Sequence, residues 1–331
     1  MTAAAHAQVG EDWSRCHTLR RPPGPSRTLL AADSRYALTT ELRYSLVARL
    51  VDEVVDHAPS NTVLLHAAAV SDDRGRVVGL VAGSGVGKTT AAISLCQESY
   101  GYVTDELLVV GARQRVTPLP KPLCVVRGQD DPVKDVVGPD AAGLRRHPQR
   151  PLTLAGVLVL DRLTGGPRPH AVAPTPASLL WQVTQQQIGT TRHSRPIAAL
   201  ASRLGGVPMA RASYQDSGDL RTMVAELLLQ PRRRSPYRAV AVDQAIPSTS
   251  GYHRAPWTDA VVAGGEVVLL RAGELHHLGP VATAAWRAAT GASATDIDRL
   301  LTRRFGPPPD AAALSQLLDS LVAAGLLVNQ P

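Results

Sequence analysis

The sequence predicts an α/β domain followed by a small α+β domain of the winged-helix type. Two observations predict the first domain: apolar runs of strand length alternate with helical segments, and a glycine-rich loop joins one such strand to one such helix. A third observation predicts the second domain, because three short apolar strands and then three amphipathic helices fill residues 257–331.

Length, composition and charge limit which classes of protein this chain can belong to. At 331 residues the chain has room for two modest domains, and its 44% hydrophobic and 19% charged residues are ordinary for a globular protein. Its cysteines, Cys16, Cys96 and Cys124, are too scattered for a disulfide framework or a CxxC metal site. The formal charge of +7 comes mostly from dispersed arginines. This argues against a specific nucleic-acid partner and favours a basic surface for an acidic ligand such as a nucleotide.

The sequence also predicts a location. The N-terminal residues lack an apolar segment of the kind found in secretory signals. No run of roughly eighteen apolar residues occurs, so we expect no membrane-spanning helix and no membrane partner. A cytoplasmic protein is therefore expected.

The first domain is expected over residues 31–230, after a flexible tail at 1–30 that is rich in Ala, Arg and Pro. Apolar runs predict strands at 63–65, 77–81, 102–104, 107–110 and 154–160. Apolar faces or helical composition predict helices at 42–55, 89–99, 177–183, 197–204 and 220–229. The seven prolines of residues 111–151 predict loops and lids in that segment.

The second domain is expected over residues 257–331, after a linker at 231–256. Short apolar runs separated by glycine turns predict strands at 260–263, 266–270 and 274–278. Apolar stripes predict helices at 281–290, 294–305 and 310–326. Gly291, Gly306 and Gly325 lie near the helix ends, where left-handed caps are common.

Residues 82–89, Ala-Gly-Ser-Gly-Val-Gly-Lys-Thr, predict a phosphate-binding P-loop of the Walker A type. Its glycines let the backbone turn N–H groups toward phosphate oxygens, and the following helix adds the positive end of its dipole. Lys88 is expected to reach the β- and γ-phosphates, and Thr89 to bind Mg²⁺. We therefore expect ATP and Mg²⁺ as cofactors, with GTP as an open alternative. The expected cofactor-binding residues are Gly83, Ser84, Gly85, Val86, Gly87, Lys88, Thr89 and Thr90.

Two adjacent carboxylates, Asp105 and Glu106, follow the next predicted strand. At a strand end near the P-loop, they are suited to bind Mg²⁺ or its waters and to accept a proton from an attacking hydroxyl. Asp161, which follows the apolar run 157–160, is the alternative metal-binding carboxylate. The lone His66 at a strand edge is, by itself, an ordinary structural residue.

The stretches 65–70, 82–89 and 102–106 together resemble the C-terminal catalytic domain of HPr kinase/phosphorylase. They resemble more closely the HPr kinase-like peptide kinases of peptide natural-product clusters. The resemblance covers roughly residues 40–230. It implies that His66, Lys88, Asp105 and Glu106 are catalytic and that Thr89 and Asp105 bind the metal ion. The doublet of that family is usually Asp-Asp, and which of the two carboxylates acts as the base stays open.

The sequence departs from that family in two places. Its Arg-Gly-x-Gly motif is represented only by the fragment Val126-Arg127-Gly128-Gln129, and no match to its C-terminal catalytic arginine is found. The resemblance therefore does not extend to the phosphorylase activity or to HPr as a substrate. Members of the family assemble into oligomers, so homo-oligomer formation is an open expectation.

The last part of the chain resembles PqqD-like domains, which recognise the leader peptides of ribosomally made, modified peptides. The residues that carry the resemblance are 264–270, 276–280, 285–286 and 321–327. In such domains the leader adds as a strand to the sheet edge beside the third helix. The resemblance implies that the peptide-binding residues are Leu275, His276, His277, Leu278, Leu314 and Leu317. Core packing is the competing expectation for the leucines of the third helix.

Together, the two resemblances imply an ATP-dependent kinase that phosphorylates a Ser or Thr of a ribosomally synthesised precursor peptide, captured by the C-terminal domain. Two alternatives stay open. One is a non-catalytic, nucleotide-binding chaperone that delivers a precursor peptide to other modifying enzymes. The other is a regulatory protein-serine kinase whose winged helix binds DNA or protein.

Overall fold

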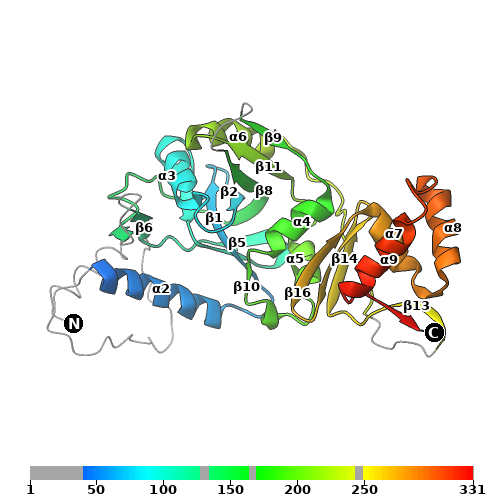
Figure 1. Ribbon diagram of the computed structural model, residues 1–331. Coiled ribbons are helices and arrows are strands. Elements are labelled where there is room, and N and C mark those ends of the chain that lie inside the picture. The colour runs from blue at the N-terminus through cyan, green and yellow to red at the C-terminus, as the bar shows by residue number, and fades with distance from the viewer. Residues whose placement is uncertain (1–39, 127–133, 164–168, 243–248, 331) are drawn as a thin grey trace. The chain divides into compact units, whose positions relative to one another are not determined.

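The computed structural model describes residues 40–126, 134–163, 169–242 and 249–330 (Figure 1). Contacts divide the chain into two compact units. The N-terminal unit comprises Met1–Val172, Gln186–Gly189 and Val207–Arg232, and the C-terminal unit comprises Ala173–Gln185, Thr190–Gly206 and Arg233–Pro331. The tail expected at 1–30 lies outside the described residues. In the described ranges, no helix combines the length and apolar character needed to cross a lipid bilayer.

A nine-stranded sheet forms the N-terminal unit, which is therefore mixed α/β. Three of its strands are parallel neighbours, in the order β2 (Arg76–Val81), β8 (Leu152–Arg162) and β11 (Met209–Tyr214). All other pairings in the sheet are antiparallel. The remaining strands are β1 (Val63–Ser71), β3 (Gly101–Thr104), β4 (Leu107–Val110), β5 (Arg115–Thr117), β9 (His170–Val172) and β10 (Gln187–Ile188). The short strands β6 (Leu123–Val126) and β7 (Lys134–Val137) form a separate pair.

Helices α3 (Lys88–Glu98) and α6 (Leu220–Leu229) share one hydrophobic core with the sheet. Leu80 of β2, Leu95 of α3 and Leu227 of α6 are all buried in it. Helix α2 (Thr40–His57) contributes Val51 to a smaller cluster with β1 and β4. The strand that precedes the glycine-rich loop and the helix that follows it are thus both anchored by buried apolar side chains.

The structure of residues 111–151 differs in part from what the sequence predicted. Loops and lids were predicted there from the prolines, but the described part of the segment contains β5, β6 and β7. Each proline in that part lies between strands and none lies inside one, so the prolines remove no hydrogen bond from a ladder.

The C-terminal unit contains two antiparallel sheets. One has the order β12-β14-β15-β16 and the other the order β17-β13-β18. The strands are β12 (Arg238–Ala239), β13 (Gly251–Arg254), β14 (Asp259–Ala263), β15 (Glu266–Arg271), β16 (Glu274–Leu278), β17 (Thr290–Ala292) and β18 (Leu327–Gln330). After β16 come the helices α7 (Pro280–Ala288), α8 (Ala294–Phe305) and α9 (Ala313–Ala323). The predicted succession of three strands and three helices is present as β14–β16 and α7–α9, and the assignment to the winged-helix class stays a prediction.

The four-stranded sheet is covered on both faces. Val267 and Leu269 of β15 belong to the core shared with α7, α8 and α9. The alternate residues point to the opposite face, where Asp259 accepts a hydrogen bond from the guanidinium of Arg195 (3.1 Å) and one from the backbone N–H of Ala198 (2.8 Å). These contacts attach α5 (Pro196–Leu204), and α4 (Pro176–Thr184) lies over β15 and β16 beside it. Both helices fall within residues 31–230 of the sequence but group with the C-terminal sheet, and the expected linker at 231–256 includes β12 and β13.

Candidate active site

The glycine-rich loop connects β2 to α3 in the N-terminal unit. Gly85 (φ +81°) and Gly87 (φ +100°) adopt left-handed backbone conformations, which residues with a Cβ adopt only under strain. Gly83, Ser84 and Gly85 are exposed. Gly87 is the N-cap of α3 and supplies no side-chain cap, so the first N–H groups of the helix are oriented toward the loop without a capping oxygen from that residue. Such an arrangement is suited to an anion.

Lys88 is buried at the start of α3. Its ammonium donates to the backbone carbonyl oxygens of Ala82 (2.9 Å) and Gly83 (3.1 Å), and so it spans the loop. Burial lowers the pKa of Lys88, and the charges of Glu106 and Asp105 oppose this shift. The ammonium is therefore held by neutral carbonyl groups that an incoming anion can replace.

The two carboxylates after β3 lie next to the first turn of α3. The hydroxyl of Thr89 donates to Oδ2 of Asp105 (3.3 Å), and the hydroxyl of Tyr102 donates to Oδ1 of the same carboxylate (2.8 Å). Asp105 is only 4% exposed. The side chain of Glu106 is 40% exposed, so the two neighbours differ sharply in their access to solvent.

A fully buried lysine contacts both carboxylates. Nζ of Lys121 lies 3.0 Å from Oδ1 of Asp105 and 3.0 Å from Oε2 of Glu106. Burial acts to lower the pKa of Lys121, but the two carboxylates outweigh burial and the pKa is raised. Sequence reasoning missed this residue. A signal was available, because a lysine in the apolar stretch Leu119-Pro-Lys-Pro-Leu123 predicts a buried cation that needs anionic partners.

Tyr214 and Arg162 were also missed. The hydroxyl of Tyr214 donates to the carbonyl oxygen of Val86 in the loop (3.1 Å). A methyl group placed on Gly87 would lie 3.6 Å from that hydroxyl oxygen and 3.9 Å from Nη1 of Arg162. Burial raises the pKa of Tyr214, and the charge of Arg162 opposes this shift. The two residues are paired at the carboxyl ends of the parallel strands β11 and β8, the edge at which α/β sheets place their ligands.

His66 and Asp161 occupy different positions relative to the loop. His66 is a half-buried residue of β1, opposite Leu107 in register, and the backbone N–H of its neighbour Ala67 donates to the carbonyl oxygen of Glu106 (3.1 Å). It therefore lies on the strand beside the carboxylates. Asp161 immediately precedes Arg162, and because side chains alternate along a strand it points to the opposite face. The fragment at 127–129 lies outside the described residues.

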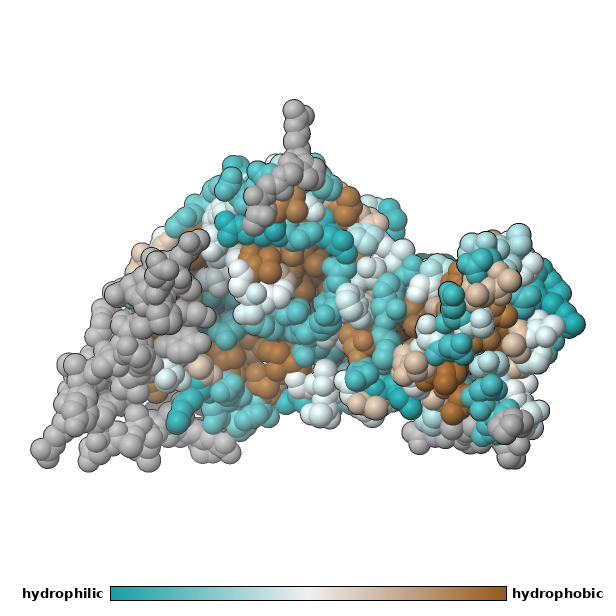
Figure 2. All heavy atoms as spheres, in the orientation of Figure 1, coloured by the Kyte–Doolittle hydropathy of each residue, from teal (hydrophilic) through white to brown (hydrophobic). Residues whose placement is uncertain are grey.

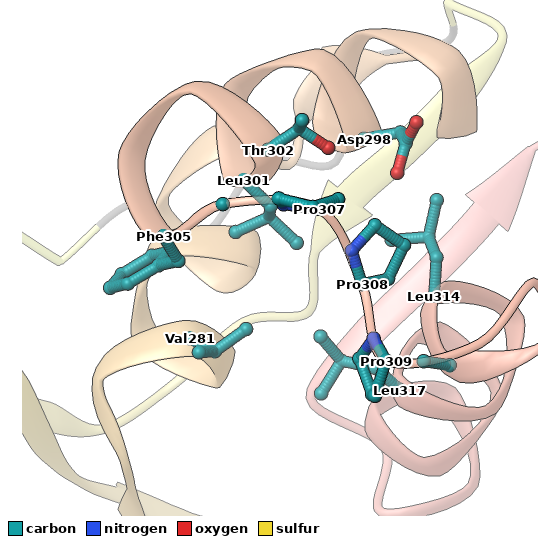
Figure 3. A pocket seen from close by; sticks show the side chains of 12 residues that line it. Val281, Asp298, Leu301, Thr302, Phe305, Pro307, Pro308, Pro309, Leu314 and Leu317 are labelled. Carbon is teal, nitrogen blue, oxygen red and sulfur yellow. The ribbon is translucent and has the colours of Figure 1, made fainter.

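The residues predicted to bind a peptide fall at two places in the C-terminal unit. Leu275, His276 and His277 are half-buried and Leu278 is buried on β16, the last strand of its sheet. Leu314 and Leu317 of α9 line a cavity of about 230 Å³ with residues of α7 and α8 (Figure 3). No residue of β16 lines it. Apolar residues reach the surface of this unit among hydrophilic ones (Figure 2).

His277 links β16 to the helix over it. Its Nε2 lies 2.8 Å from Oε2 of Glu266, and its ring stacks on that of Trp181, with 6.1 Å between the ring centroids. Glu266 also accepts a hydrogen bond from the hydroxyl of Thr175, the N-cap of α4 (2.7 Å). One face of β16 is thus held against α4.

The side-chain oxygens near the glycine-rich loop are of the kind that binds a magnesium ion. Mg²⁺ prefers hard oxygen ligands and is commonly bound through one or two carboxylates together with substrate phosphates. Thr89 and Asp105 bring one hydroxyl oxygen and one carboxylate together. In the described part of the chain, no three His, Cys, Asp or Glu side chains gather into a metal site. A metal ion at Thr89 would therefore need phosphate or water oxygens to complete its shell.

No protein-family model matches the sequence, and no curated protein matches it. Among solved structures, the HPr(Ser) kinase/phosphatase from Coxiella burnetii is a distant match. It is 11% identical, with a TM-score of 0.26, and the match covers 50% of this chain and 93% of that one.

Proposed function

We propose that the protein is an ATP-dependent kinase that phosphorylates a Ser or Thr hydroxyl of a ribosomally synthesised precursor peptide, recognised by its C-terminal domain. One observation carries the proposal: the hydroxyl of Thr89, at the start of the helix after the glycine-rich loop, contacts the buried Asp105, with Glu106 half exposed beside it. A phosphate cradle, a pair of metal ligands and a candidate base thus lie together.

The loop is proposed to hold the β- and γ-phosphates of the nucleotide. The N–H groups of residues 83–89 face them, and the ammonium of Lys88 exchanges the carbonyl oxygens of Ala82 and Gly83 for phosphate oxygens. Thr89 and Asp105 would hold Mg²⁺, which when bound neutralises charge on the phosphates. The guanidinium of Arg162, close to Gly87, adds positive charge at the same edge.

We assign the base to Glu106, because it is the carboxylate with access to solvent, while Asp105 is enclosed. Glu106 takes the proton of the acceptor hydroxyl while the oxygen of that hydroxyl forms a bond to the γ-phosphorus. The bond between that phosphorus and the bridging oxygen to the β-phosphate breaks, and ADP leaves with the electron pair. The products are the phosphorylated peptide and ADP.

Peptide capture is proposed at the edge of β16. Within the described residues β16 pairs only with β15, so its other edge has backbone groups available to an added strand. Leu275, His276, His277 and Leu278 would flank that strand. The cavity lined by Leu314 and Leu317 would take an apolar side chain of the leader.

The test is incubation of the protein with ATP, Mg²⁺ and candidate precursor peptides, each carrying a leader segment, followed by mass spectrometry. We expect a mass gain of one phosphate on a Ser or Thr, and its loss in Lys88→Ala. Peptide binding without phosphate transfer in the wild type would contradict the kinase and support the chaperone. Specific binding to a DNA duplex, with no peptide binding, would support the regulatory alternative.

A further inference from the structure

Lys121, the lysine that contacts both carboxylates, is part of a backbone segment with little conformational freedom. Lys121 lies between β5 and β6, with Pro120 and Pro122 on either side. Proline fixes its own φ and restricts the residue before it, so the backbone around Lys121 has little freedom. The position of its side chain is therefore set by the chain itself as well as by its partners.

The ammonium of Lys121 has an acceptor for each of its three donors. Oδ1 of Asp105 and Oε2 of Glu106 lie at 3.0 Å each, and the carbonyl oxygen of Pro122 lies at 3.2 Å. It differs in this from Lys88, whose acceptors are two carbonyl oxygens of the loop. Lys121 is thus a fixed cation of the site, whereas Lys88 is free to exchange partners when an anion arrives.

The contacts of Lys121 leave the two carboxylates in different situations. Oδ1 of Asp105 is occupied by Lys121 and by the hydroxyl of Tyr102, which leaves Oδ2 directed at Thr89. Glu106 is held through Oε2 while 40% of its side chain is exposed. Two adjacent carboxylates without a cation between them would repel one another and turn apart.

We propose that Lys121 is a positioning residue for phosphate transfer, which holds Oδ2 of Asp105 at Thr89 and keeps Glu106 on the side from which the acceptor hydroxyl approaches. This inference rests on the proposed kinase function. Lys121 acts through the two carboxylates and touches neither nucleotide nor peptide. Its contribution is orientation, so a small cation of the same shape should replace it.

The first experiment measures phosphate transfer by Lys121→Ala with and without added n-propylammonium, which matches the atoms removed. We expect kcat to fall roughly 100-fold, as for loss of a positioned base, with the KM for nucleotide changed by less than about threefold. Propylammonium should restore kcat at least about tenfold in a saturable manner. Propanol, which has the size without the charge, should not.

The second experiment does not depend on catalysis. Affinity for a non-hydrolysable ATP analogue is measured with and without Mg²⁺ in the wild type, in Lys121→Ala and in Lys121→Met, which preserves the length of the side chain. We expect both variants to bind the metal-free analogue like the wild type and to lose most of the gain that Mg²⁺ confers. Propylammonium should return that gain to Lys121→Ala. Arg221→Met, which removes the cation of an exposed pair with Glu98, is the matched control and should behave as the wild type.

The outcomes separate this inference from the kinase proposal. Variants that keep the full effect of Mg²⁺ and a normal kcat would overturn the role of Lys121, as would a loss that propylammonium does not restore. A wild-type protein that binds the Mg²⁺ complex of the analogue but phosphorylates no peptide would overturn the kinase, and of the role of Lys121 it would leave only the placing of Asp105 at Thr89, which the second experiment measures. A wild-type protein that does not bind the analogue would overturn both.

Discussion

The surroundings of the glycine-rich loop and the edge of β16 differ in what they leave open. Around the loop, the buried charges of Lys121 and Asp105 are paired with one another, and Glu106 is partly exposed beside them. On β16, His276 and His277 are half-buried, and the outer backbone edge is unpaired within the described residues. Enclosed ion pairs fix atoms for chemistry, whereas an open strand edge accepts partners that vary in side chain. Reaction and recognition should therefore respond separately to mutation.

The largest effect is expected from Asp105→Asn. The amide keeps the shape of the carboxylate but loses the charge next to Thr89 and Lys121, so kcat should fall roughly 100- to 1000-fold. Affinity for the peptide, measured by fluorescence anisotropy, should stay unchanged. Asp161→Asn is the control, because Asp161 is exposed and lies on the face of β8 opposite to Arg162. A parallel loss of peptide affinity in Asp105→Asn would break the separation of the two regions.

A smaller effect is expected from Leu317→Ala. The truncated side chain enlarges the cavity of the C-terminal unit, so affinity for the peptide should fall about tenfold while kcat at saturating peptide is retained. Titration calorimetry and steady-state kinetics measure the two quantities. Leu229→Ala alters a leucine that is 80% exposed and should change neither. A fall in kcat in Leu317→Ala would show that the cavity has a part in catalysis.

Gly87→Ala should have a smaller effect than the two changes above, on nucleotide binding at the loop. Gly87 has φ +100°, so alanine there is strained by about 1 kcal/mol or more, and its methyl group would lie 3.6 Å from the hydroxyl of Tyr214. We expect weaker nucleotide binding and a lower melting temperature. Gly143→Ala also places alanine at a positive φ (+69°), with open space around the methyl group, so it should lower the melting temperature alone. Equal nucleotide affinities in the two variants would contradict a role of the loop in binding.

The smallest effect concerns Cys96 on α3, which is buried in the core of the N-terminal unit. Burial raises the pKa of its thiol to about 12, so at pH 8 only roughly one molecule in ten thousand carries the reactive thiolate. Alkylation followed by mass spectrometry should therefore be slow in the folded protein and fast in denaturant. A nucleotide bound at the loop should slow it further, because it stabilises the folded state. Rapid labelling of the native protein would show that this core opens readily.

The sequence was most informative where the pattern is local. The loop at 82–89, the strand before it, the helix after it and the doublet Asp105-Glu106 could all be located, because each is set by neighbouring residues. Lys121 and Tyr214 could not be assigned to the site. Lys121 reaches the doublet from a segment whose prolines suggested loops, and Tyr214 reaches the loop only because β11, an unpredicted strand, pairs with β8. Such pairings are set by the register of distant strands, which a single sequence does not specify.

The interleaving of the two units limits how this protein can be divided. In the sequence, helices α4 and α5 lie between β9 and β11 of the N-terminal unit, but they belong to the C-terminal unit. There they cover the sheet face that carries Val261 and Val268, which are fully buried. A fragment that starts near residue 233 would lack both helices and expose that apolar sheet face to water. Residues 233–331 alone are therefore not expected to fold as they do in this protein, and a fusion of this unit to another protein would have to include residues 173–206.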